Sequence, residues 1–308
     1  MPNFVGSQID VPYSDEQAWN GQWGIRIKRN SAKILGTELV APNSVVGFNG
    51  AGISLKPSMS MPTFDIANQN TMAADGSATG TVVDTVTATL MFVYWAGAGA
   101  FAGNLAVSQV APTLSGATGG IYMLGTSGAA AQIRFIGWIY LDSGGNLVDT
   151  EASRLVANYY NRRPSRMFLC PNYADDNAAT TYARASATWT TIAATAAASR
   201  LEYIGNGEDA VHFGLNVTLG AAGPINASLF GLADTNVTNP EVQASFPITE
   251  PAKSSIYIAH VPLVVTVGYR TENALVQSGN AVTILADDAR NGATADPAAT
   301  YLSGVVYT

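Results

Sequence analysis

Apolar and polar residues alternate along much of this chain, and that alternation constrains its fold more than any other feature. From residue 211 to residue 219 the sequence reads Val-His-Phe-Gly-Leu-Asn-Val-Thr-Leu, with an apolar side chain at every odd position. Successive side chains of a β-strand point to opposite faces, whereas a helix returns to one face only every 3.6 residues or so. The segment is therefore expected to be a strand with one buried face.

Similar runs occur throughout the sequence and predict an all-β protein. They cover residues 82–95, 132–141, 200–204, 225–232, 256–269 and 282–286, separated by turn-forming residues at 142–146, 205–207, 220–224, 277–280 and 290–292. Helices are expected only at 14–19, 150–157 and 193–199, each of about two turns at most. Many short strands with frequent turns are typical of sandwiches and barrels. We therefore predict antiparallel β-sandwich domains that are jelly-roll-like.

The length of 308 residues is sufficient for two domains, each with a full core. We predict an N-terminal segment at 1–75, a first β-sandwich domain at 76–171 and a second at 172–308, with a linker at 175–177. The N-terminal segment is rich in Pro, Gly and Asn and has too few consecutive apolar residues for a core of its own. We therefore expect it to be irregular and to anchor the protein on a neighbouring chain.

The composition indicates a scaffold or binding protein rather than an enzyme. Charged residues make up 12% of the chain, against about 25% in an average soluble domain. This low value predicts that other chains cover much of the surface. A net charge of -7 argues against nucleic-acid or anionic-membrane binding. One Cys and two His exclude a disulfide framework, a multi-cysteine zinc site and a histidine-rich metal centre, so no metal and no cofactor is expected.

The N-terminus has neither the basic region nor the apolar core of a signal peptide, so we expect synthesis in a cytoplasm. The most apolar stretch, 88–102, is shorter than the roughly 18 residues that a membrane-spanning helix needs. No membrane insertion is expected.

A glycine-rich loop and the single cysteine have catalytic potential but simpler structural interpretations. Residues 97–102 fit G-x-G-x-x-[GA] after a strand, yet no acidic residue follows at 119–123, so a tight loop is favoured over a dinucleotide site. Cys170 could pair with His212 or His260 as nucleophile and base, but no local signature supports this. We interpret Cys170 as a buried structural thiol, His212 as facing solvent or a partner subunit, and His260 as lying on an edge strand.

The adjacent acidic pairs at 175–176, 208–209 and 287–288 are the carboxylates that a polysaccharide-cleaving enzyme would need about 5 to 10 Å apart. All three lie in predicted loops, where a turn or solvated-charge role is simpler.

Basic residues cluster in two parts of the sequence and suggest either a phosphate site or ion pairs. They are Arg26, Lys28, Arg29 and Lys33, followed by Arg154, Arg162, Arg163 and Arg166. Pairing with Asp142, Asp149 and Glu151 is the favoured interpretation, because Arg suits bidentate ion pairs. Aromatic residues Trp138, Tyr140, Tyr159 and Tyr160 could stack on sugars, but their strand positions favour core and cross-strand roles.

Two stretches resemble tailed-bacteriophage fibre and virion proteins. Residues 134–140, Arg-Phe-Ile-Gly-Trp-Ile-Tyr, precede 157–164, Ala-Asn-Tyr-Tyr-Asn-Arg-Arg-Pro, much as an R-x-x-G-[WYF] strand precedes an N-Y-Y-N-R-R-P strand in that family. Residues 187–190 and 200–204 resemble the strands that come next. The similarity covers about 81–217. Its motif positions, expected to be structural or interfacial, are Arg134, Gly137, Trp138, Asn158, Tyr159, Tyr160, Asn161, Arg162, Arg163 and Pro164.

The resemblance implies a non-enzymatic virion structural protein, made in the bacterial host cytoplasm. The expected form is a short tail fibre or spike that takes part in host attachment. As partners it implies further copies of itself in a homotrimer, other virion proteins at the N-terminal segment, and a host cell-surface glycan or protein. Two alternatives stay open: a capsid-decorating, neck or baseplate protein with no receptor-binding role, and a carbohydrate-active tailspike.

Overall fold

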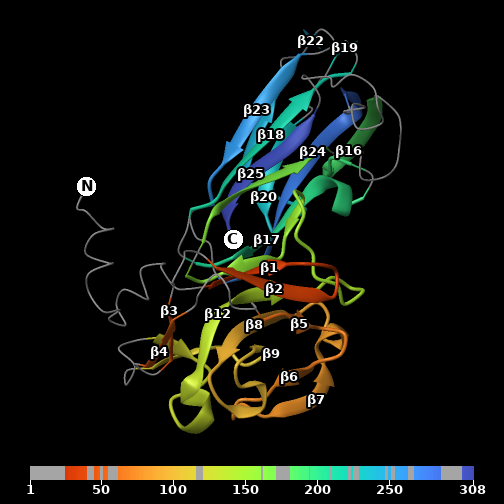
Figure 1. The fold of residues 1–308 in the computed structure, drawn as a ribbon. Coiled ribbons are helices and arrows are strands. Elements are labelled where there is room, and N and C mark those ends of the chain that lie inside the picture. The colour runs from red at the N-terminus through yellow and green to blue at the C-terminus, as the bar shows by residue number, and fades with distance from the viewer. Residues whose placement is uncertain are drawn as a thin grey trace, which may run out of the picture. The chain divides into compact units, whose positions relative to one another are not determined.

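The computed structural model describes residues 25–39, 45–48, 51–54, 62–115, 121–160, 162–170, 181–193, 195–207, 210–220, 223–224, 229–246, 249–250, 254–262, 267–285 and 300–308. Within these ranges the chain forms β-strands and short 3₁₀ turns, with no α-helix, so the all-β prediction is confirmed (Figure 1). The helix expected at 150–157 is wrong, because β13 (Ser153–Arg154) and β14 (Val156–Asn158) occupy that stretch. The helix expected at 193–199 is reduced to a 3₁₀ turn at Ala197–Ser199. Residues 14–19 lie outside the described ranges.

The chain divides into two compact units. The first contains 1–149, 155–163 and Thr308, and the second contains 150–154 and 164–307. This division differs from the predicted boundaries at 75 and 171. The reason is that residues 155–163, together with the last residue of the chain, return to the first unit.

Part of the predicted N-terminal segment belongs to the core of the first unit. Strands β1 (Ile25–Arg29), β2 (Ile34–Leu39) and β5 (Phe64–Asp65) form an antiparallel sheet. The buried Ile25, Ile27, Leu35, Phe64 and Ile66 all join the main hydrophobic cluster of that unit. These strands are too short to enclose a core alone, but they complete the core of the strands that follow. The described part of 1–75 is thus not the irregular anchor that we expected.

The main sheet of the first unit has the strand order β10-β11-β12-β8-β9, with β14 also pairing with β12. Its strands are β8 (Leu90–Ala96), β9 (Leu105–Ser108), β10 (Thr113–Ser115), β11 (Ile121–Met123) and β12 (Ile133–Tyr140). Two further hairpins are formed by β3 (Val45–Phe48) with β4 (Ala51–Ser54), and by β6 (Asn70–Met72) with β7 (Ala78–Val82).

A β-bulge in β12 decides which side chains reach the core. Phe135 lies opposite Tyr94 and Gly137 opposite Val93, so Ile136 is an extra residue on this strand. Strict alternation would place residues 135 and 138 on opposite faces. The bulge instead brings their aromatic rings together, with centroids 5.0 Å apart.

The second unit is a β-sandwich with jelly-roll topology, as predicted. One sheet has the order β15-β25-β18-β23 and the other β13-β17-β24-β20-β21. The strands are β15 (Pro164–Leu169), β17 (Arg200–Gly205), β18 (His212–Thr218), β20 (Leu229–Asp234), β21 (Val242–Ser245), β23 (Ser255–His260), β24 (Gly268–Leu285) and β25 (Tyr301–Tyr307). Apart from the short β13 and the hairpin β20–β21, whose two strands lie in the same sheet, these strands alternate between the sheets as in two interleaved Greek keys.

The long strand β24 connects most of its sheet. β16 (Thr181–Thr191) pairs with residues 275–285 of β24, and β17 pairs with residues 268–273 on the same edge. The turn predicted at 277–280 is therefore wrong, because this part of β24 stays extended beside β16. The register between the two strands is irregular near Ser278, where it pairs with Ser186. A small two-stranded antiparallel sheet of β19 (Gly223–Pro224) and β22 (Thr249–Glu250) completes the strands of this unit that the structure describes.

Replacing Gly137 by Ala is expected to destabilise the first unit by about 2 kcal/mol. A Cβ atom there would press against the Ala157 carbonyl oxygen and lie 2.9 Å from Ile27 Cδ1 and 3.2 Å from Asn158 Cα. Gly279→Ala is the matched control, because a Cβ atom there meets no atom within 4 Å. Urea unfolding of both variants measures the difference, and equal effects would show that the bulge tolerates a side chain.

Candidate functional site

Asn158, one of the predicted motif positions, joins two distant parts of the first unit. It is 2% exposed, and its side-chain Oδ1 accepts the Ile27 N–H at 2.7 Å while its Nδ2 donates to the Ile27 carbonyl at 3.0 Å. A side-chain amide carries the same donor and acceptor as a peptide group. Asn158 therefore binds β1 as a neighbouring strand would, although Ile27 lies 131 residues earlier in the chain.

The aromatic motif residues form a packed cluster around the bulge. The Trp138 ring lies 5.6 Å from that of Tyr159, and Tyr159 lies 5.3 Å from Phe135 and 4.8 Å from Tyr160. Trp138 and Tyr160 are buried and Tyr159 is half-buried. The core interpretation is confirmed for Trp138 and Tyr160, whose buried rings leave little surface for stacking on a sugar. Tyr159 and Tyr160 follow β14 and, contrary to the prediction, do not lie on a strand.

Two of the three arginines of the motif lie over rings of the same cluster. Arg134 is fully buried, and its guanidinium carbon lies 5.0 Å from the centroid of the Tyr160 ring. Arg162 lies 6.0 Å from the Tyr159 ring. Burial raises the pKa of Tyr160, and the charge and hydrogen bond of Arg134 act against that shift. Planar guanidinium groups suit such stacking better than Lys would.

The end of the motif meets the end of the chain. The backbone N–H groups of Arg163 and Thr308 donate to each other's carbonyl oxygens, both at 3.0 Å. Pro164 is the first residue of β15 and of the longer segment of the second unit, 164–307. Asn161 lies outside the described residues.

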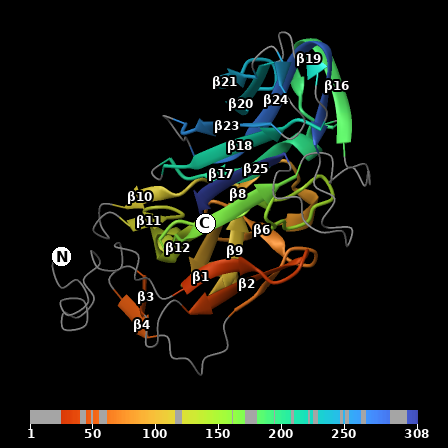
Figure 2. The ribbon, with the colours of Figure 1, turned by 90° about the horizontal axis from the view of Figure 1, so that it is seen from above.

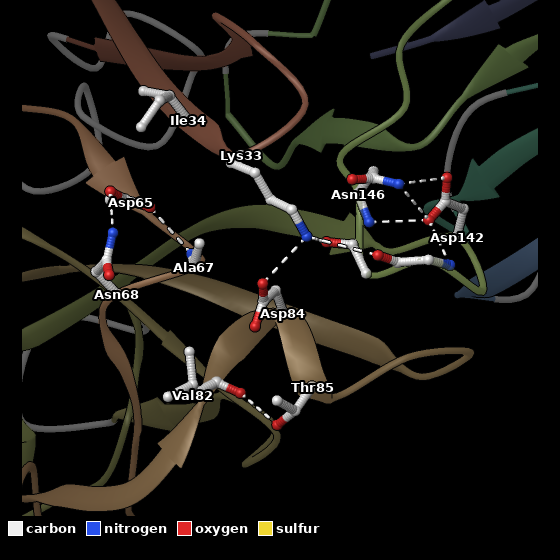
Figure 3. Close-up of polar contacts among 12 residues, drawn as sticks. Lys33, Ile34, Asp65, Ala67, Asn68, Val82, Asp84, Thr85, Asp142 and Asn146 are labelled. Carbon is white, nitrogen blue, oxygen red and sulfur yellow. Dashed lines mark hydrogen bonds and ion pairs between the residues drawn. The ribbon is translucent and has the colours of Figure 1, made fainter.

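Lys33 holds three loops of the first unit together (Figure 3). Its ammonium group lies 3.0 Å from Asp84 Oδ2 and 2.9 Å from the Gly145 carbonyl oxygen. Asp142 accepts the N–H groups of Gly144 and Asn146, both at 2.8 Å. Slight burial acts to raise the pKa of Asp142, but its bonds to Asn146 and Gly144 and the charge of Lys33 lower it overall. These polar groups hold the loops together.

The ion pairs of the first basic cluster differ in part from those predicted. Arg26 Nη1 lies 3.2 Å from Glu38 Oε1, and Lys28 Nζ lies 3.5 Å from Glu38 Oε2. Neither Glu38 nor Asp84, the partner of Lys33, was among the expected acidic partners. The sequence could not identify them, because β2 brings Glu38 beside β1 only through sheet pairing.

The remaining sequence candidates have structural explanations where the structure describes them. Residues 97–102 connect the antiparallel hairpin β8–β9, and Gly99, at a φ of 82°, allows close approach to the Gly76 carbonyl. A dinucleotide site would need a helix and a parallel strand there. Cys170 is buried and His212 is exposed, as expected. All three acidic pairs fall wholly outside the described residues.

The outward surface of the four-stranded sheet in the second unit is the candidate binding site. Phe213, Leu215 and Val217 of β18 face the core, so the residues between them face outward. We call this surface the outer face; it consists of Arg166 and Phe168 on β15, Tyr301, Ser303, Val305 and Tyr307 on β25, His212, Gly214 and Asn216 on β18, and Tyr257 and Ala259 on β23. Figure 2 shows β25, β18 and β23 side by side.

Aromatic side chains are prominent on the outer face. Tyr257 is 61% exposed and its ring lies across Gly214, where any Cβ atom would collide with it. On the other side, Phe168 stacks on Tyr301 with ring centroids 5.6 Å apart and planes 28° apart. Polar Ser303 and Asn216 lie between these aromatic groups in the sheet register. Sequence reasoning missed the site because its strands are distant in the chain.

A buried acid–histidine cluster in the second unit was also missed. His260 lies on edge strand β23, as predicted, but its side chain is buried. Nδ1 lies 2.8 Å from Glu272 Oε1, and Nε2 lies 2.8 Å from Glu241 Oε2. Desolvation acts to lower the pKa of His260, but the two carboxylates raise it overall. Burial raises the pKa of Glu272 to about 7. The only sequence signal is an acidic residue within the stretch 271–276, all of which is buried.

Comparisons with known proteins identify no relative of this chain. No protein-family model, curated protein or solved structure matches the chain. Among the residues that the structure describes, no helix is long and apolar enough to cross a membrane.

Replacing Asn158 by Ala is expected to lower the free energy of unfolding by about 3 kcal/mol, because the buried N–H and carbonyl of Ile27 both lose their side-chain partner. Asn280→Ala, at an exposed position of β24, is the control and should change little. Urea unfolding measures both. A loss below about 0.5 kcal/mol for the first variant would contradict a linking role.

The stability of the second unit is expected to fall as the pH rises from about 5 to 8. Protonated His260 stabilises the folded unit. This stabilisation is fully present below the ordinary histidine pKa of 6.5 and is lost as the pH rises past the raised pKa of the folded state. Glu272, ordinarily at 4.5 and raised to about 7, must ionise in a buried site over the same range. Hydrogen exchange in β23 and β24 across this pH range measures the effect.

The variant Glu272→Gln should flatten that pH profile, because Gln does not titrate. Glu38→Gln, in the first unit, should leave it unchanged. A stability that rises toward pH 8 would contradict this, because it would show that the folded cluster binds no more protons than the unfolded chain.

Proposed function

We propose that this protein is a non-enzymatic structural component of a bacteriophage virion, of the short tail-fibre or spike type, and that it takes part in host attachment. The outer face is the observation that carries this proposal. It combines aromatic, apolar and polar side chains, each exposed or half-buried, on one side of a jelly roll, an architecture found in viral capsid and lectin domains.

The composition of the outer face favours attachment over a purely structural role. A capsid-decorating protein needs a broad apolar base, whereas a receptor-binding surface mixes aromatic anchors with hydrogen-bonding groups. Here Tyr257, Tyr301 and Phe168 alternate with Ser303 and Asn216. The similarity of 81–217 to phage fibre and virion proteins points in the same direction.

A homotrimer would strengthen weak attachment. Only 12% of the residues are charged, which leaves surface available for contacts between copies. Three linked outer faces raise the effective concentration for each later contact, so avidity exceeds the affinity of one face. Other virion proteins are proposed as further partners.

Fluorescently labelled protein is expected to bind saturably to cells of a host strain, with mass photometry of the same sample giving the mass of a trimer. Tyr257→Ser should weaken binding at least tenfold, because it removes an exposed ring without opening the core. Leu114→Ser, at a residue of the first unit that is 53% exposed, is the matched control. A folded oligomer that binds no candidate host would favour a capsid-decorating, neck or baseplate role, and a monomer at micromolar concentration would contradict the trimer.

A further inference from the structure

We propose that the outer face binds an acidic glycan, a polysaccharide whose sugar rings carry carboxylate groups. This inference rests on the proposed function and specifies the receptor chemistry of the same site. It follows from three properties of the surface: its exposed aromatic rings, its hydrogen-bonding groups and its charge.

The first property is the arrangement of rings. Tyr301, Asn216 and Tyr257 lie in register across β25, β18 and β23, so the backbones of the two tyrosines are about 10 Å apart. The Tyr257 side chain lies so close over Gly214 that it occupies the space a Cβ atom of residue 214 would need. Most of the surface of Tyr257 nevertheless stays exposed. Flat, exposed rings offer apolar faces to the C–H groups of a sugar ring, and the phenol hydroxyls can hydrogen-bond its hydroxyls.

The second property is the distribution of polar groups between the rings. Ser303 lies in the next row of the register, beside Gly214, and its hydroxyl is 3.3 Å from the Gly214 carbonyl oxygen. Asn216 supplies a carboxamide between Tyr301 and Tyr257. Hydroxyl and carboxamide groups both donate and accept hydrogen bonds, which suits a polyhydroxyl ligand.

The third property is charge. The described residues of the outer face include Arg166 and His212 but no Asp or Glu, although the whole chain carries 22 acidic residues and a net charge of -7. Arg166 lies opposite Val305, which in turn lies opposite His212. Its guanidinium carbon is 5.0 Å from the Phe168 ring centroid, so a cation stands beside the stacked pair Phe168–Tyr301. A carboxylate near these rings would meet a cation, and none of the described residues that make up the outer face is acidic.

The experiment uses the full chain and immobilised bacterial surface polysaccharides that contain uronic acids. Each polysaccharide is also presented in a carboxyl-reduced form, in which the uronic acids have become neutral hexoses of the same linkage. We expect binding to at least one acidic polysaccharide, weakened at least tenfold by carboxyl reduction and by increased salt.

Variants test the residues separately. Tyr257→Ser should weaken binding to both forms, because it removes the ring. Arg166→Gln should weaken only binding to the acidic form, and should remove most of its salt dependence. Leu114→Ser and Lys28→Gln, in the first unit, are matched controls for an exposed apolar side chain and an exposed cation.

Cell binding separates this inference from the proposed function. Binding that resists periodate oxidation of surface sugars but is lost after protease treatment of the cells would overturn the glycan and leave the attachment role standing. Equal binding to the acidic and carboxyl-reduced forms would overturn the requirement for a carboxylate. The absence of binding to both cells and polysaccharides would overturn both proposals.

Discussion

The inward packing of one face of each strand is the constraint on which the rest of the second unit depends. Phe213, Leu215 and Val217 belong to the core between the two sheets. Because the side-chain period of a strand is two, fixing these residues inside fixes His212, Gly214 and Asn216 outside. The candidate binding surface is therefore determined by the same contacts that stabilise the fold, and a register shift of one residue would exchange core and surface.

Buried polar groups give each unit its specific pairing. Asn158 attaches β1 to the first unit through two hydrogen bonds to one residue, which an apolar side chain of similar size could not make. His260 connects β23 of one sheet to Glu272 of the other. Buried groups of this kind are costly when unpaired, so they disfavour any arrangement that separates them. Their contribution is to specify one fold among several compact alternatives.

Several elements were predictable from local patterns. The strand at 211–219 and the β-sandwich class follow from alternation, and the buried Cys170 follows from its apolar neighbours. The bulge at Ile136 was not predictable, because it depends on how β12 meets β8 and β14. The turn expected at 277–280 failed for a related reason: Gly and Asn favour turns, but the stretch lies within β24, where Ser278 pairs with Ser186 of β16.

By itself, the sequence determined the strand class, the faces of individual strands and the scarcity of catalytic and metal-binding residues, since each is a property of local pattern or composition. Only the tertiary structure decided that β15, β25, β18 and β23 lie together and bring Phe168, Tyr301 and Tyr257 onto one surface. It likewise decided that β1, β2 and β5 contribute side chains to the core of the first unit. The physical reason is that strand pairing joins residues more than 100 positions apart, and the free energy of such pairing depends on the whole core rather than on any one segment.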